Sequence, residues 1–301
     1  MATTHLRKQR SIATQVVAPF TGEGAYHGST KARPAVARPR PPLVEENRAT
    51  SLEALAKGGA NGTFEALFPN AWDAVSSLPV PSQEAIRGEG VTLCWCPFEL
   101  ALREAGPLTR QVLEQMREHL GGAKRHVYID SKIQYFEAGD VPVDSQHWHI
   151  DGSITARGPE VEALGYGVVH DMKARLLGPS APPTYLSYQS STHCATRFVD
   201  EPVCLTLPAL IPNFDGLDQM VRAQDPASVA QPAGAIIRFD GLSLHRAVAA
   251  SEAGWRLWIR CVETDREVHV GPNIIECYGT VFRTGRGIVS SGGPDASVDQ
   301  R

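Results

Sequence analysis

Long apolar runs are missing from this sequence, and none approaches the roughly 20 residues that a membrane-spanning helix needs. We therefore expect no membrane segment. The amino-terminal stretch carries basic residues without a following apolar segment, so no secretory signal is predicted. The six cysteines show no Cys-x-x-Cys spacing, which argues against a zinc ribbon or a thioredoxin-like motif. Together these absences predict a protein of the reducing cytoplasm.

An excess of one sign of charge is also missing. The 301 residues carry a formal charge of -4, which gives the whole chain no electrostatic reason to bind nucleic acid or an acidic surface. The hydrophobic fraction of 42% and the charged fraction of 21% are usual for a soluble globular protein. A chain of this length can bury a full core and form one large β-rich domain or two small ones.

The first 48 residues differ in composition from the rest. They hold eight basic and three acidic side chains, a net charge of +5. The Pro- and Arg-rich stretch 33–42 favours an extended, polyproline-like chain that cannot pack a core. We expect a flexible leader over 1–48, one domain over 49–283 and a flexible Gly/Ser tail over 284–301. A second interpretation of the leader, as a basic arm that contacts a phosphate-bearing partner, stays open.

Helical patterns are expected mostly between residues 50 and 120. Thr63–Phe68 is a short amphipathic run that ends at Pro69. Pro107–Leu120 is the clearest helix, because its apolar residues recur at helical spacing and two glycines follow it. We expect the apolar side of this helix to pack into the core.

Short strands dominate the remainder of the chain. We expect strands at Val127–Phe136, Gly165–His170, Thr184–Tyr188, Ala195–Val199, Ala235–Phe239, Leu244–Ala249, Arg256–Thr264 and Ile274–Phe282. Five prolines between 200 and 232 predict a long insertion or lid there. Many short strands with turn signals and few helices predict a closed or double-layered β architecture.

The stretch from Gln146 to Gly152 concentrates groups that bind metals. In an extended strand successive side chains alternate, so His147, His149 and Asp151 point to one face, with Trp148 and Ile150 on the other. Two imidazoles and a carboxylate on one face suit a divalent metal better than an apolar core.

A second stretch downstream supplies a third ligand. Residues 234–246 are typical of a strand, a tight turn and a second strand that carries His245. The next strand places Arg256, Trp258 and Arg260 on one face. A His-x-Asp pair with a distant His is the two-histidine, one-carboxylate set, which leaves positions open on a non-haem Fe(II).

His149, Asp151, His245 and Arg256, in this order and in strand contexts, resemble the motif of the Fe(II)- and 2-oxoglutarate-dependent oxygenases. Arg256, eleven residues after His245 in a Gly-aromatic-Arg setting, looks most like the phytanoyl-CoA hydroxylase branch. The resemblance covers residues 127–265. It implies a mainly β fold with supporting helices, namely a double-stranded β-helix (jelly roll, cupin-like), with Fe(II), 2-oxoglutarate and O2. An Asp is retained where halogenating relatives have a small residue, which favours hydroxylation.

The resemblance also implies roles for individual residues. Arg256 is expected to bind the distal carboxylate of 2-oxoglutarate, with Arg260 as a second candidate. Gln134 or Tyr135 is expected to reach the co-substrate; the other would point to the opposite face. The candidate substrate-binding residues are His147, Tyr185, Tyr188 and Arg197. A small metabolite is the expected substrate, and a nucleobase or a protein side chain reached through the basic leader stays an alternative.

Three alternatives remain at this point. His147, His149 and His245 could form an all-histidine site with Asp151 outside it. A cupin-like metalloenzyme that does not use 2-oxoglutarate would carry the same ligands. A non-catalytic binding or structural protein on the same barrel would use the basic leader as its working part and would need no metal.

Overall fold

The structure is a computed structural model that describes residues 62–142, 146–152, 154–156, 169–178, 181–268, 274–275, 280–283 and 287–290. The leader expected over 1–48 lies outside these residues. The helices and strands are β1 (Thr63–Phe68), β2 (Trp72–Ser77), α2 (Gln83–Arg87), β3 (Thr92–Leu93), β4 (Cys96–Pro97), α3 (Phe98–Glu104), α4 (Pro107–Arg117), β5 (His126–Phe136), β6 (Ile154–Ala156), β7 (Val169–Asp171), α6 (Met172–Leu177), β8 (Thr184–Gln189), β9 (Thr196–Val199), β10 (Val203–Pro208), β11 (Leu210–Ile211), α7 (Asp215–Gln224), β12 (Ser228–Ala230), β13 (Ala235–Asp240), β14 (His245–Ala247), β15 (Gly254–Thr264), β16 (Ile274–Ile275), β17 (Thr280–Arg283) and β18 (Gly287–Ser290).

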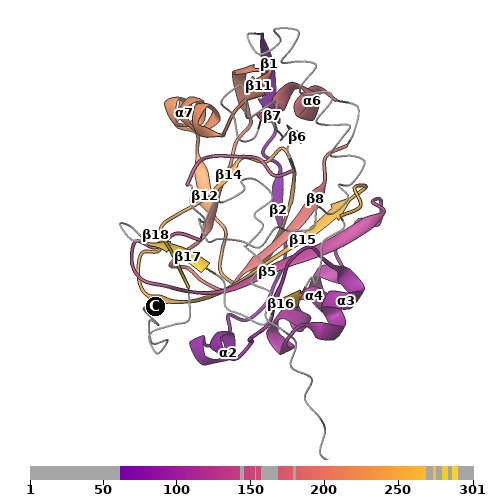
Figure 1. The fold of residues 1–301 in the computed structure, drawn as a ribbon, viewed down its shortest axis with the longest axis vertical. Helices are drawn as coiled ribbons and strands as arrows, with labels where there is room; N and C mark the ends of the chain where they lie inside the picture. Colours follow the sequence, from indigo (N-terminus) through magenta and orange to yellow (C-terminus); the bar gives the residue numbers. More distant parts are fainter. Residues whose placement is uncertain are drawn as a thin grey trace, which may run out of the picture.

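An antiparallel major sheet with the order β2-β13-β8-β15-β5-β4 forms the centre of the fold (Figure 1). Its longest pairing joins β15 to β5, from Gly254 opposite Phe136 to Thr264 opposite His126. On its other side β15 pairs with β8. Because it lies inside the sheet, β15 has both of its backbone edges hydrogen-bonded, which fixes the register of every side chain that it carries.

Side chains alternate between the two faces of this sheet. Leu257, Ile259 and Cys261 of β15 point to a core that α2, α3 and α4 complete, and these helices cover one face (Figure 1). In α4, Val112, Leu113 and Met116 are buried at helical spacing, while Pro107 occupies the first turn. Arg256 and Arg260 therefore point to the opposite, inner face of the sheet.

A smaller sheet with the order β12-β9-β14 packs against the inner face of the major sheet. Phe198 of β9 contacts Phe239 of β13 with ring centroids 5.1 Å apart. Tyr185, Ile237 and Val262 complete this inner core. An isolated bridge between His149 and His245 adds the segment 146–152 to the edge of the smaller sheet.

The expected mainly β architecture with few helices is confirmed. The helix expected at Thr63–Phe68 is wrong: this run is β1 and pairs with β10. Ala66 and Phe68 are buried while Glu65 and Leu67 are not, so the burial period is two and not 3.6. Pairing with a distant strand has overridden the local pattern, which six residues are too few to define.

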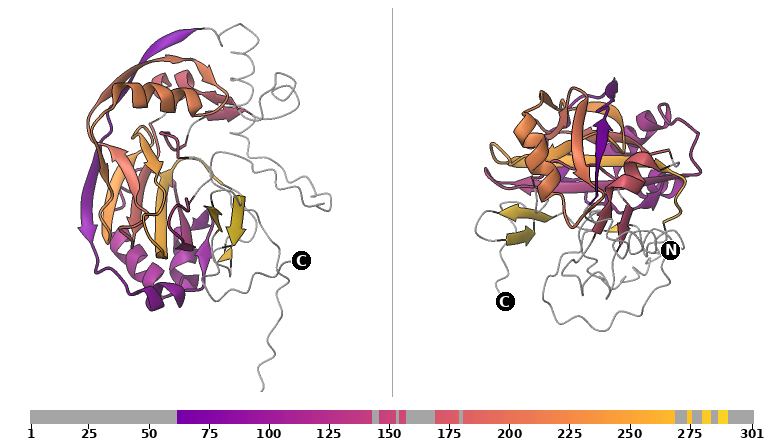
Figure 2. Two further views of the ribbon diagram at one scale, coloured as in Figure 1. Left: turned by 90° about the vertical axis from the view of Figure 1, so that its left-hand side faces the viewer. Right: turned by 90° about the horizontal axis from the view of Figure 1, so that it is seen from above.

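The segment expected as an insertion or lid, 200–232, folds into β10, β11, α7 and β12. Leu217 and Val221 of α7 are buried in a second core with Leu205 and Leu207 of β10. Figure 2 shows α7 at the end of the molecule opposite to α2, α3 and α4.

Several expected elements differ from the structure at their boundaries. Trp72–Ser77, inside the stretch expected to be mostly helical, is strand β2. The strand expected at Ile274–Phe282 appears as β16 and β17, with 276–279 outside the described residues. Gly287–Ser290, placed in the flexible tail, forms β18 and pairs with β17. No helix in the described ranges is long and apolar enough to cross a membrane.

We predict that Glu89 stabilises the start of α4. Its buried carboxylate accepts hydrogen bonds from the backbone N–H groups of Leu108 (3.1 Å) and Thr109 (2.7 Å), which have no partner within the helix. Glu89→Gln should lower the free energy of unfolding by about 1–3 kcal/mol, measured by urea denaturation. Glu114→Gln, an exposed change on the same helix, should change it by less than about 0.5 kcal/mol; equal effects would contradict the prediction.

Candidate metal centre

The backbone brings the three expected ligands together. His149 N–H donates to the carbonyl of His245, and His245 N–H donates to the carbonyl of His149, each over 3.0 Å. The ring centroids of the two histidines are 4.4 Å apart, and Nε2 of His245 lies 3.8 Å from Oδ1 of Asp151. One ligand atom from each of His149, Asp151 and His245 lies within 4.8 Å of the others, so this group could hold a metal ion.

Backbone carbonyls orient both imidazoles. Nδ1 of His149 lies 2.8 Å from the carbonyl oxygen of His147, and Nδ1 of His245 lies 2.9 Å from that of Ser243. A carbonyl oxygen only accepts hydrogen bonds, so Nδ1 of each neutral ring carries the proton. Nε2 then keeps its lone pair for a metal, an arrangement typical of metal-binding histidines.

Asp151 is held by a guanidinium of the major sheet. Nη1 of Arg260 donates to Oδ2 of Asp151 over 2.7 Å, and Nη2 of Arg260 donates to Oδ2 of Asp130 over 2.8 Å. Burial alone would raise the pKa of Asp151, but Arg260, His245 and His149 outweigh it and lower this pKa to about 2. The carboxylate is therefore charged at neutral pH, with Oδ1 directed toward His245.

The ionisation of His149 also suits a metal ligand. Burial and the neighbouring His245 lower the pKa of His149 to about 4. Its imidazole is therefore neutral at physiological pH, and no proton competes with a cation for Nε2. Two imidazoles and one carboxylate on three separate chain positions fit a divalent ion such as Fe(II).

His147 lies outside this group. Its Nδ1 forms an ion-pair contact of 2.9 Å with Oδ1 of Asp215 on α7, and the side chain is about 38% exposed. The segment 146–148 is not a regular strand, so the alternation that would align His147 with His149 does not hold there. The geometry therefore favours the His149, Asp151 and His245 set over the all-histidine set.

Arg256 is a buried cation, 3% exposed, on the inner face of the sheet. Its Nη1 donates to the carbonyl of Cys194 over 2.9 Å, and its Nη2 donates to Oε1 of Gln134 over 2.9 Å. No carboxylate within the described part of the chain pairs with it, and its Nε has no hydrogen-bond partner there. Burial lowers the pKa of Arg256, which reflects the cost of this uncompensated charge.

Gln134 and Tyr135, the two residues expected near the co-substrate, lie on opposite faces of the sheet, as strand alternation requires. Gln134 contacts Arg256 on the inner face. Tyr135 lies on the opposite face, where its ring centroid is 5.4 Å from that of Trp255. It packs there against the core between the major sheet and helices α2, α3 and α4. Of the two, Gln134 is the one next to Arg256, and a role in binding the co-substrate stays a prediction.

Lys132 is a further cation at this site that the sequence analysis did not identify. It stands opposite Trp258, and its Nζ lies 5.5 Å from the Trp258 ring centroid. Burial, Arg256 and Arg260 lower the pKa of Lys132 to about 8. The inner face of β5 and β15 thus carries a ladder of three pairs, which are Asp130 with Arg260, Lys132 with Trp258 and Gln134 with Arg256. The alternation of β5, applied two residues before Gln134, is the signal that could have found it.

The structure separates the remaining substrate-binding candidates. Tyr185 lies at the site, because its ring stacks on Phe239 (5.0 Å) and Phe239 contacts His245 (5.4 Å). Tyr188 is buried in the core between the major sheet and helices α2, α3 and α4. Arg197 donates to the carbonyl and hydroxyl oxygens of Ser228 on β12, over 2.7 and 3.1 Å. Only Tyr185 among these three adjoins the proposed ligands.

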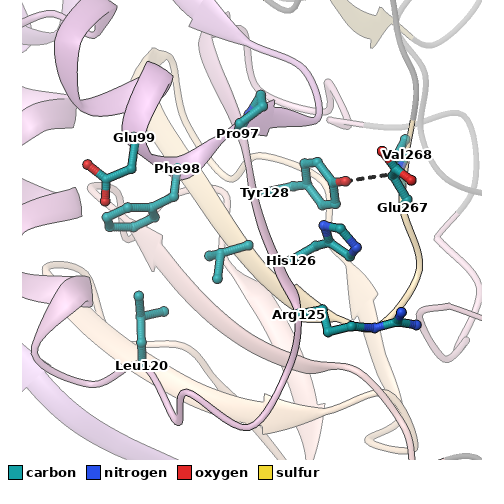
Figure 3. Close-up of a pocket in the computed structure, with 10 residues that line it drawn as sticks. Pro97, Phe98, Glu99, Leu120, Arg125, His126, Tyr128, Glu267 and Val268 are labelled. Atoms are coloured by element: carbon teal, nitrogen blue, oxygen red, sulfur yellow. Dashed lines mark hydrogen bonds between the residues drawn. The ribbon is translucent and has the colours of Figure 1, made fainter.

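An open pocket of about 660 Å³ lies apart from the metal centre, at the edge of the major sheet (Figure 3). Tyr128 forms part of its wall, and its hydroxyl accepts a hydrogen bond from the N–H of Val268 over 2.9 Å. The residues that line it are Pro97, Phe98, Glu99, Leu120, Arg125, His126, Val127, Tyr128, Glu267 and Val268. None of the three candidate ligands is among them.

No known family profile matches the chain, and no curated protein matches it. The functional argument therefore depends on the geometry of the centre itself, which is a His/Asp/His group that could bind a metal in a mainly β protein.

We predict that the protein binds one divalent ion, and that His149→Ala, Asp151→Asn and His245→Ala each lower its affinity at least about tenfold. Cobalt(II) titration of the metal-free protein, followed by visible absorption, measures this affinity. His147→Ala is the matched control and should bind normally, because its ring is paired with Asp215. If Asp151→Asn binds cobalt(II) normally and His147→Ala does not bind it, the metal ligands are His147, His149 and His245.

Proposed function

We propose that this protein is an Fe(II)- and 2-oxoglutarate-dependent oxygenase that hydroxylates a small organic substrate. The observation that carries the proposal is the buried guanidinium of Arg256, which has no acidic partner among the described residues and faces the same interior as the metal-binding group. A metal-binding group alone fits many reactions. A buried cation on the same inner face favours a bound anion, as a 2-oxo acid would supply.

The order of the strands supports the double-stranded β-helix that this function implies. Along the chain, β5 and β8 of the major sheet flank the bridge at His149, and β9 and β12 of the smaller sheet follow. The chain then passes from β13 to β14 and back to β15, so it moves repeatedly between the two sheets. This alternation is typical of a jelly roll, with the metal ligands on the smaller sheet and Arg256 on the larger.

The side chains of such a site would have two roles, to bind the iron and to orient its ligands. His149, His245 and Oδ1 of Asp151 would hold iron from one side, while Arg260 keeps Oδ2 of Asp151 engaged and the carboxylate oriented. When bound, iron would supply the activation of O2 that couples decarboxylation of 2-oxoglutarate to hydroxylation of the substrate.

Two cations on the inner face match the charge of the co-substrate. Arg256 offers a planar pair of donors for the distal carboxylate, and Gln134 fixes one of its nitrogens in place. Lys132 stands two residues before Gln134 on the same face of β5. It adds a second positive charge without an acidic partner among the described residues. Phe136, over which Arg256 lies at 5.1 Å, helps to keep water away from this end.

We predict that the protein forms a chelate with Fe(II) and 2-oxoglutarate, seen under anaerobic conditions as a weak visible charge-transfer band. Arg256→Gln should weaken the affinity for 2-oxoglutarate about tenfold or more, because a charge-assisted pair is lost, with metal affinity unchanged. Lys132→Met should have a smaller effect in the same direction. Arg238→Gln is the control on the same sheet, because that guanidinium donates to the carbonyl of His119 instead.

Two results would contradict the proposal. A protein that binds iron but never shows the band would be a metalloprotein that does not use a 2-oxo acid. A band with the same 2-oxoglutarate dependence in Arg256→Gln as in the unchanged chain would remove the anion role of Arg256. Succinate formation in air provides the independent measure of turnover.

A further inference from the structure

A second group of cations lies toward the opposite end of β15 from Arg256, and one of its members contacts Asp151. Arg175 comes from α6, and Arg266 follows the last residue of β15. Both side chains are half-buried. Neither forms an ion pair within the part of the chain that the structure describes: Asp240 and Asp151 favour the charge of Arg175 only from a greater distance, and no carboxylate among the described residues does so for Arg266.

Arg175 is packed against the backbone of a metal-ligand residue. Its Nη2 donates to the carbonyl of Asp151 over 3.4 Å, while its buried Nε has no hydrogen-bond partner. Gly241 leaves the space that the guanidinium fills, because a Cβ there would meet Nη2, whereas a Cβ at Gly152 would lie 3.6 Å from Nη2, an ordinary contact distance. Gly152 also has a φ of +69°, which favours glycine.

Strand register places Arg266 at the same corner. Val262 stands opposite Tyr185, and Glu263 stands opposite Thr184 at the start of β8, so the chain reaches Arg266 just beyond this end. The hydroxyl of Tyr185 approaches Gly152 from the other side, 2.9 Å from where a Cβ would lie. Burial lowers the pKa of Arg175 and of Arg266, and the charge of Arg266 lowers that of Arg175 further, so the two guanidiniums repel each other.

This corner is separate from the site proposed for the co-substrate. Arg256 lies at the start of β15 and Arg266 beyond its end, which at about 3.3 Å per residue puts their backbones more than roughly 20 Å apart. Arg260 stands between them and is occupied by Asp130 and Asp151. A single small dianion cannot reach both ends, so the guanidiniums of Arg175 and Arg266 call for a second anion.

We propose that Arg175 and Arg266 form an oxyanion subsite for the primary substrate, which is therefore a small organic acid with a carboxylate, sulfonate or phosphate group. The assignment of this anion to a substrate rests on the proposed oxygenase function; the subsite itself does not. Arg175 would hold the acid group next to the Asp151 backbone, with the remainder of the molecule directed past Tyr185 toward the metal-binding group.

Binding of inorganic phosphate and of sulfate to the metal-free, full-length protein tests the subsite, with isothermal titration calorimetry as the measurement. Arg175→Gln and Arg266→Gln should each raise the Kd about tenfold, and the Lys variants should recover part of the loss. Arg246→Gln is the matched control, since this guanidinium also lacks an acidic partner among the described residues but lies over Trp148, 4.9 Å from its ring centroid. Far-ultraviolet circular dichroism checks that each variant is folded.

Three outcomes of this titration would overturn the subsite. These are no phosphate or sulfate binding by the unchanged protein, equal binding by Arg175→Gln and Arg266→Gln, or loss of binding in Arg256→Gln instead.

The substrate class is tested by the consumption of 2-oxoglutarate in the iron-loaded protein. Small carboxylates, sulfonates and phosphate esters should stimulate it, and their amide or alcohol counterparts should not. Arg175→Gln and Arg266→Gln should lose the stimulation, and the control Arg246→Gln should keep both the stimulation and the unstimulated rate. Equal stimulation by neutral compounds would refute the inference. If no 2-oxoglutarate is consumed under any condition while phosphate still binds, the oxygenase proposal fails and the anion subsite remains.

Discussion

The ion pairs of Arg260 connect the metal-binding group to the framework of the fold. This guanidinium contacts Asp151 at 2.7 Å and Asp130 at 2.8 Å, and all three side chains are largely buried. Two carboxylates around one cation would leave one negative charge in a poorly solvated interior. Arg175 contacts the backbone of Asp151 without an ion pair to its carboxylate, and a divalent ion between His149 and His245 is a further positive neighbour that the ligand atoms could hold.

The inner face of the major sheet is unusual in how much charge it carries. Its opposite face is an apolar core against helices, whereas the inner face presents Lys132, Arg256 and Arg260 in adjacent rungs. Burying cations costs free energy, and a fold retains such groups where a ligand compensates them. The proposed co-substrate and the proposed anionic substrate would share this role, one at each end of β15.

The sequence allowed the metal-binding group to be predicted because strand alternation and the two-histidine, one-carboxylate pattern act at short range. His149 and Asp151 are two residues apart, and the only long-range step was to bring His245 beside them. Prediction failed where long-range contacts decided the outcome. Thr63–Phe68 became a strand through pairing with β10, and His147 left the metal face because Asp215 of α7 binds its ring. Arg175 was invisible in the sequence, since its place depends on the packing of α6 against the Gly241 turn.

The side chains of β15 alternate between the two faces of the sheet, so the same strand register buries its apolar side chains and positions the charged side chains of the site. Arg256, Trp258 and Arg260 alternate with Leu257, Ile259 and Cys261, so a shift of one residue against β5 would exchange the two sets. Two guanidiniums would then enter the apolar layer beneath the helices, and the inner face of the sheet would carry aliphatic groups in their place. A misregistered chain would therefore be too unstable to persist, so molecules that remain folded are also those with a complete site.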